Sequence, residues 1–315
     1  MQYELSLGLP PAPILITTAA CISLKRACCM LAPPWFIDPL LIGNHNSSMN
    51  EKNGITYTGG AGFIDISHVR HCCDDTKHVY DQLMSSSGSP SLITTSHGVA
   101  TIKQSVPRSM WTQVARAISY SDSIGYEITS YWVSTPAEHN SAFSPEDLCS
   151  NYLGTYVAER AIASPPKGSK DFNTAVTITL NDMLVQLKAQ PLVETQKAFT
   201  PIMNCWMSPN TSYTVTNIDY WASMTLKRRN FSITPITPWK VGHASDFQTP
   251  AWVTQALGPV SQYYDFTYHY VIGGPPGTPG VKKTLKEADF SKEISAIRAD
   301  AAQKYGAKYD KPTCP

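Results

Sequence analysis

A cluster of three glycines, Gly59, Gly60 and Gly62, separates two segments of different periodicity. Residues 55–58 before the cluster are β-branched or aromatic, which is typical of a short strand. Residues 63–84 after it carry apolar side chains at helical spacing, which predicts a long helix. The glycines therefore mark a strand-to-helix junction. The apolar positions of the predicted helix are Ile66, Val69, Cys73, Val79 and Leu83.

The rest of the chain shows the same mixture of helical and β-rich segments. A helix is predicted to begin near Ser144, because Ser144 is a good cap, Pro145 suits a first helical position, and acidic residues follow. Further helices are predicted over residues 109–132, 175–188, 192–199 and 290–305, and strands over 92–95, 99–102, 213–217, 222–226 and 231–236. The fold class is therefore α+β: a mainly helical core with short peripheral β-hairpins and long irregular loops.

Charge and hydropathy exclude two classes of partner. Twenty-five basic and twenty-four acidic residues leave a net charge of +1, so no overall field attracts the chain to nucleic acid. No apolar run approaches the roughly 18 to 20 residues of a transmembrane helix. Charged residues make up only 16% of the chain, yet they cluster at 65–81 and 146–147. That clustering directs attention to these two segments.

Eight cysteines bear on the compartment. An even count with one cysteine near the end suits disulfides in an oxidising, extracellular or periplasmic location. Two pairs of adjacent cysteines, Cys28 with Cys29 and Cys72 with Cys73, favour the alternative of reduced structural thiols. The spacing of a cysteine zinc site is absent. We expect disulfides, with the thiol alternative left open.

Residues 62–80 form the most concentrated polar segment. On a helix, Asp65 and His68 share a face, so Asp65 could orient His68 as a general base. A second line of His71, Asp74 and His78 has the spacing of a metal site. The ordinary alternative is a solvated helix with surface salt bridges.

Two other helices offer polar candidates. Glu127 is expected among aromatic rings, where a carboxyl group tends to keep its proton and could act as a general acid; the alternative is a surface glutamate. Asp147 and Asn151 lie on one face of the next helix with Gly154, although acidic residues there also complement the helix dipole. No nucleophile elbow, HExxH motif or phosphate-binding loop is present.

Three stretches resemble a bacterial family catalogued as domain of unknown function 4056. They are "NEKNGITYTGGAGFIDISHVRHCCDDT" (50–76), "SAFSPEDLCSNYLGT" (141–155) and "LKRRNFSITPITPWKV" (226–241). The "RACC" at 26–29 and His45 are also similar to the family's N-terminal pattern.

The resemblance implies an exported or lipoprotein-like protein and brings no activity with it. Members often have an acidic residue in place of His71, which argues against a metal site through His71, and a histidine in place of Tyr126. Residues at positions that resemble the family's polar motifs are His45, Asp65, His68, Arg70, Asp74, Glu127, Asp147 and Asn151.

The similarity continues to about residue 241 without a linker. It implies one globular domain over residues 1–241, with an irregular N-terminal arm. Residues 242–315 are then a Pro/Gly-rich C-terminal extension that ends in a helix and packs on the same domain.

The leading hypothesis is an exported hydrolase with a polar cleft between three helices. His68, Glu127 and Asp65 are the expected catalytic residues. The expected substrate-binding residues are Arg70, Asp147, Asn151 and His45. No cofactor is fixed by these residues; a divalent metal held by His68 or Asp74 stays an alternative. A cell-envelope polymer or lipid fits the inferred compartment. The rival hypothesis is a non-enzymatic binding or structural protein of the envelope with a buried polar network.

Overall fold

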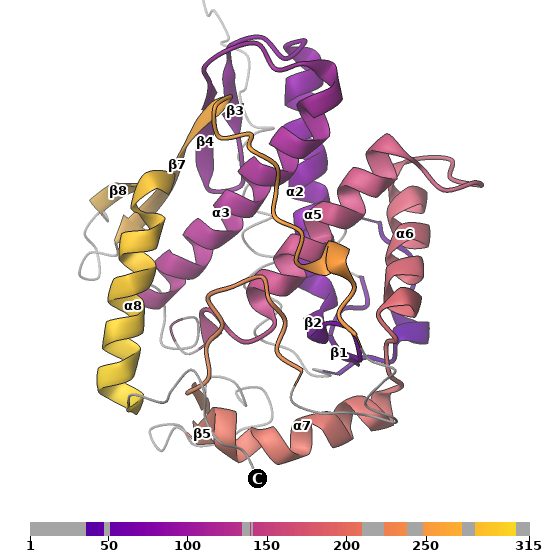
Figure 1. The fold of residues 1–315 in the computed structure, drawn as a ribbon, viewed down its shortest axis with the longest axis vertical. Helices are drawn as coiled ribbons and strands as arrows, with labels where there is room; N and C mark the ends of the chain where they lie inside the picture. Colours follow the sequence, from indigo (N-terminus) through magenta and orange to yellow (C-terminus); the bar gives the residue numbers. More distant parts are fainter. Residues whose placement is uncertain are drawn as a thin grey trace, which may run out of the picture.

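Three helices form the centre of the molecule. In the computed structural model, α2 (Ile66–Ser85), α3 (Trp111–Val133) and α5 (Asp147–Ala163) pack against one another, and the other elements surround them (Figure 1). The residues that the structure describes are 36–46, 51–133, 139, 141–209, 224–237, 248–272 and 281–306. The expected α+β fold with a helical core is confirmed.

Three outer helices cover this centre on different sides. The helix α6 (Phe172–Gln186) packs on α5, α7 (Leu192–Trp206) runs below the central helices, and α8 (Phe290–Tyr305) packs on α3 (Figure 1). Short 3₁₀ turns are η1 (Pro39–Leu41), η2 (Arg108–Met110), η4 (Ala251–Val253) and η5 (Glu287–Asp289).

The strands form small antiparallel sheets at the periphery. The largest has the order β3-β4-β7-β8, so strands from both halves of the chain pair in it. Two further sheets are the pairs β1-β2 and β5-β6. The strands are β1 (Ile55–Thr58), β2 (Gly62–Asp65), β3 (Leu92–Thr94), β4 (Gly98–Ile102), β5 (Met207–Pro209), β6 (Met224–Leu226), β7 (Tyr264–Ile272) and β8 (Val281–Lys286).

The central helices join two apolar cores. In α2, Val69 and Cys73 pack in one core with α5 and α6, while Val79 and Leu83 pack in the other with α3 and the large sheet. All of the apolar positions predicted for this helix are buried. The helix α5 is buried along most of its length, as expected of a helix enclosed by neighbours. Polar residues on α5 are therefore carried into the interior.

The predicted start of the helix at residue 63 is wrong. Gly62 to Asp65 form β2, which pairs with β1 from Thr58↔Gly62 to Ile55↔Asp65, and α2 begins only at Ile66. Gly62 has φ +67°, and a Cβ on it would lie 2.1 Å from the carbonyl oxygen of Ile236. The glycine cluster is therefore a hairpin turn that precedes the helix.

Other boundaries also differ from prediction. The helix after Ser144 begins at Asp147 with Glu146 at the N-cap position, so the predicted cap at Ser144 is wrong. The Ser144 hydroxyl instead donates to the side chains of Glu146 and Asp147. Residues 231–236 form no strand; their turn is held by Asn230, which donates to the carbonyl oxygen of Thr234. Strands β7 and β8 lie in the Pro/Gly-rich C-terminal extension, for which only the terminal helix is predicted. The predicted strand over 213–217 lies outside the described residues.

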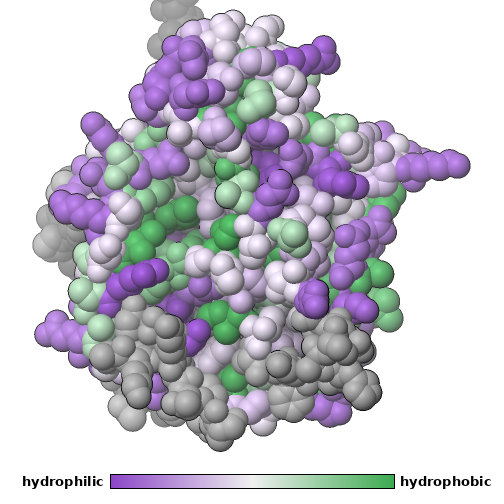
Figure 2. Space-filling view, in the orientation of Figure 1, coloured by the Kyte–Doolittle hydropathy of each residue, from purple (hydrophilic) through white to green (hydrophobic). Residues whose placement is uncertain are grey.

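The C-terminal part supplies structure to the same cores. Strand β7 pairs with β4, and α8 places Phe290 and Ile297 in the core that contains α3. In the space-filling view, hydrophobic residues on this face form separate patches among hydrophilic ones (Figure 2). Among the described residues, no helix combines the length and apolar character that crossing a bilayer needs.

Candidate functional site

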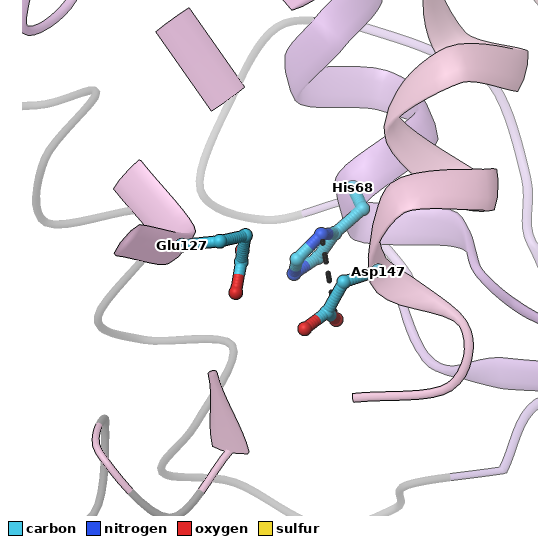
Figure 3. A group of neighbouring side chains, drawn as sticks. All are labelled: His68, Glu127 and Asp147. Atoms are coloured by element: carbon cyan, nitrogen blue, oxygen red, sulfur yellow. Dashed lines mark ion pairs between the residues drawn. The ribbon is translucent and has the colours of Figure 1, made fainter. Parts of the chain in front are cut away.

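Side chains from the three central helices meet at one point. His68 comes from α2, Glu127 from α3 and Asp147 from the start of α5, and the three point toward one another (Figure 3). One nitrogen or oxygen atom of each lies within 4.8 Å of the others. No other such group of three or more His, Cys, Asp or Glu side chains occurs in the described part of the chain.

Local features of the helices explain why these side chains meet. The carboxylate of Asp65 accepts the backbone N–H of Ser67 at 2.7 Å, which caps α2 and fixes its first turn with His68. Where α5 crosses α2, Gly154 has no side chain, and a Cβ there would lie 2.3 Å from the carbonyl oxygen of Val69. The glycine lets the two helices approach closely and brings Asp147 to His68.

His68 is the most accessible member of the cluster. Its side chain is 23% exposed, and its Nδ1 lies 3.8 Å from Oδ1 of Asp147. The same nitrogen lies 3.1 Å from Oδ1 of Asn151, one turn further along α5. A carbonyl oxygen accepts hydrogen bonds, so this contact favours the tautomer that carries its proton on Nδ1. In that tautomer the Nε2 atom carries the lone pair.

Glu127 is buried and held by a strained main chain. Its Oε2 accepts the backbone N–H of Phe143 at 2.8 Å. Phe143 has φ +58°, a conformation that bulky residues rarely adopt. Its ring is fully buried and contacts Phe231, which holds the main chain in place. Strain of this kind concentrates at functional sites, where the surrounding fold maintains it.

Asp147 and its neighbour Glu146 bring two carboxyl groups close together at the start of α5. Asp147 accepts the backbone N–H of Ser144 at 2.7 Å and its hydroxyl at 2.9 Å. Burial, and then the charges of Glu127 and Glu146, raise the pKa of Asp147 well above its usual range. Burial also raises the pKa of Glu146, despite its hydrogen bond with Ser144. Carboxylates are therefore gathered here under conditions that disfavour their charge.

The donor set has a definite chemical capacity. An imidazole nitrogen and two carboxylates can take a proton from water, return it to a leaving group, or bind a divalent cation. The predicted substrate-binding residues Asp147 and Asn151 thus lie with His68 and Glu127. Asp65, expected to orient His68, caps α2 instead, and the group in contact with His68 Nδ1 is Asn151.

His45, Arg70 and Asp74 lie in a second polar network. His45 Nε2 is 3.1 Å from Asp74, and its Nδ1 is 2.9 Å from Glu51. Arg70 donates to the carbonyl oxygens of Ile42, Gly43 and Lys52 and to the side chain of Asn53. These contacts fasten the segments on either side of residues 47–50 to α2.

The second network predicts a dependence of stability on pH. Burial lowers the pKa of His45, but the hydrogen bonds and charges of Asp74 and Glu51 outweigh it and raise the pKa above 6.5. The pKa of His45 is higher in the folded state than in the unfolded state, so protonated His45 stabilises the fold. This stabilisation is complete below about pH 6.5 and is lost as the pH rises through the folded-state pKa. The free energy of unfolding should fall over that range.

Urea unfolding of the wild type and of His45→Gln at about pH 6 and pH 8.5 checks this prediction. We expect the wild type to lose more free energy of unfolding than the variant as the pH rises. Equal losses in the two proteins would contradict it.

Three of the described cysteines are buried thiols: Cys72, Cys73 and Cys149. Burial raises the pKa of Cys73 well above its usual value, and it raises the pKa of Cys149 to about 12. They are therefore inert structural thiols. Of the other five cysteines, Cys205 is disulfide-bonded, as expected of this residue type in an oxidising compartment. The remaining four lie outside the described residues, and their disulfides stay a prediction.

Several supporting residues could not be singled out from the sequence. Ser144 suggested only a helix cap, yet it contacts both Glu146 and Asp147. Phe143 gave no signal, because nothing in an apolar residue's identity marks a positive φ. The nearest sequence signal was the position of both residues within the "SAFSPEDLCS" stretch.

Residues 40–217 match the model of a family described as "Protein of unknown function (DUF4056)". The matched range covers more than half of the chain and contains His68, Glu127 and Asp147. Neither the curated proteins nor the solved structures include a match to this chain.

Proposed function

The chain belongs to the family described as protein of unknown function DUF4056, and from its site we propose that it is a hydrolase whose active site is the His68–Glu127–Asp147 cluster. The observation that carries the proposal is the convergence of these three side chains from three separate helices. A substrate in the cell envelope or outside the cell, and export of the protein, belong to the same proposal.

Hydrolysis needs a base for water and a proton for the leaving group. The imidazole of His68 and the carboxylates of Glu127 and Asp147 provide basic lone pairs at one place. The water oxygen bonds to the electrophilic atom of the substrate as the bond to the leaving group breaks. The proton removed from water passes to the leaving group, so the elements of water are divided between the two products.

Burial of the cluster also supports a catalytic role. Glu127 is 3% exposed and Asp147 6% exposed, so water and substrate meet the cluster on the side of His68. Charges act more strongly in such a low-dielectric position than in bulk water. The strained main chain at Phe143, which donates to Glu127, is a further cost that a catalytic role explains.

The rival hypothesis of a structural polar network fits these charges less well. A buried carboxylate in a stabilising network is normally paired with an arginine or lysine. Among the described residues, no such side chain forms an ion pair with Glu127, and Asp147 pairs only with His68. Burying carboxyl groups without a directly paired cation costs stability, which points to a function other than holding the fold together.

Replacement of His68 tests the proposal. The His68→Ala variant removes the accessible base of the cluster and should lose about 100-fold or more of the hydrolytic rate. Release of p-nitrophenol from its acetate, butyrate and phosphate esters measures this, alongside product formation from bacterial envelope extracts. The matched control is His78→Ala, which changes an exposed histidine of the same helix and should keep the wild-type rate.

Two results would count against a hydrolase. One is a wild-type protein that is inert on all of these substrates. The other is a His68→Ala variant that is folded by circular dichroism and as active as His78→Ala.

A further inference from the structure

We propose that His68, Glu127 and Asp147 are the ligands of one divalent metal ion, and that the chemistry of the donors selects zinc. The metal site stands on the geometry of the cluster. Only the catalytic role of the ion rests on the proposed function.

The distances fit a metal site that closes slightly around its ion. Zinc lies about 2.0 to 2.2 Å from nitrogen and oxygen ligands, so two ligand atoms around it lie about 3 to 4 Å apart. The three donor atoms here are within 4.8 Å of one another. Small side-chain rotations that move these atoms by about 1 Å bring them to the distances of a zinc site. Each donor is carried by a different packed helix, which holds the set in place.

Each ligand is oriented by a neighbour that is not a ligand. Asn151 contacts Nδ1 of His68, which leaves Nε2 for the ion. The backbone N–H of Phe143 holds one oxygen of Glu127, and Ser144 holds Asp147. Metal-binding histidines and carboxylates usually have such outer partners, which fix the tautomer and the direction of the lone pairs.

The charges around the cluster favour a cation. Glu127 and Asp147 place two carboxylates in the interior, and the described residues supply no lysine or arginine in an ion pair with either. The charge of the neighbouring Arg229 acts on Asp147 from a distance, but its guanidinium forms no ion pair with that carboxylate and donates to the carbonyl oxygens of Ala142 and His139. A doubly charged ion would balance both carboxylates and remove the cost of burying them unpaired.

The composition of the donor set indicates the kind of ion. Imidazole nitrogen suits zinc and other transition metals, whereas magnesium and calcium prefer oxygen ligands alone. Three protein ligands also leave a coordination position open, as in catalytic rather than structural zinc sites. A zinc ion supplies acidity to a water molecule that it binds, which is what a hydrolase requires.

The second network shows what a non-binding arrangement looks like. His45 also lies between two carboxylates, but Glu51 lies beside Nδ1 and Asp74 beside Nε2. Neither ring nitrogen faces an open position, so a metal ion would have to displace an existing pair. Asp74→Asn is therefore a matched control for Asp147→Asn.

Calorimetric titration of the chelator-treated protein with Zn²⁺ tests the proposal. We expect one equivalent of zinc to bind the full-length wild type and the Asp74→Asn control. His68→Ala, Glu127→Gln and Asp147→Asn should each weaken binding by at least about 100-fold, more than loss of an outer partner such as Asn151 usually costs. Circular dichroism confirms that each variant is folded. Visible absorption of bound Co²⁺ reports the ligand set independently.

The outcomes separate the two proposals. Absence of Zn²⁺ and Co²⁺ binding by the wild type, or binding that survives all three ligand substitutions, overturns the metal site. If hydrolysis persists after chelation but is lost in His68→Ala, the metal-site proposal is overturned and the hydrolase proposal is supported. Site-specific binding by a protein that hydrolyses nothing keeps the metal site and overturns the hydrolase.

Discussion

The Gly154→Val variant is expected to lose about 2 to 4 kcal/mol of its free energy of unfolding. A Cβ at this position would lie 2.3 Å from the carbonyl oxygen of Val69 and 2.7 Å from the Cβ of Cys72. Both atoms belong to the packed helix α2, so the two helices have to move apart. Urea unfolding followed by circular dichroism measures the loss.

The control for this variant is Ala163→Val, an exposed position on the same helix. It adds branched carbons without a clash, so it should cost less than about 1 kcal/mol. Because the contact at Gly154 also brings Asp147 to His68, any folded Gly154→Val protein should bind zinc weakly. Equal stability of Gly154→Val and Ala163→Val would show that the close approach of α2 and α5 is not required.

The sequence predicted the helices better than it predicted their ends. Periodic apolar positions found α2, because Val69, Val79 and Leu83 are buried on one side as their spacing requires. The strand over 62–65 was missed, because its pairing with β1 depends on a turn whose glycines also suit a helix start. Likewise β7 and β8 pair across a stretch that carries no signal of its own.

The residues of the site could be nominated from the sequence, but their partners could not. The hypothesis of one cleft between three helices is consistent with the contact of His68, Glu127 and Asp147. Helical spacing suggested Asp65 as the partner of His68, yet its carboxylate is drawn to the free N–H groups at the start of α2. The contact made instead, with Asn151, depends on how α5 packs.

Arg70 was expected in the site together with His68, but the fold places the two side chains in different surroundings. Arg70 is two residues from His68, so on a helix it projects from a different face. Its guanidinium donates to main-chain carbonyls at Ile42 and Lys52. Nothing local in the sequence distinguishes such a buried structural arginine from one that binds an anionic substrate. The structural role of Arg70 becomes visible only once the fold brings Ile42 and Lys52 against α2.

Combining His68→Ala with Glu127→Gln is expected to cost no more activity than the worse single substitution. Each single change should lower kcat/KM by about 100- to 10,000-fold. If the two side chains act as one unit on a shared ion or water molecule, removing either leaves nothing for the other to assist. Changes at independent sites would instead multiply their effects.

The claim that three helices build one active site is tested most directly by kcat/KM. It is measured for the wild type, the two single variants and the double variant, on the best substrate of the ester and envelope panel. The account of one site built from three helices predicts that the double variant matches the less active single variant. A double variant whose loss equals the product of the two single losses would contradict it.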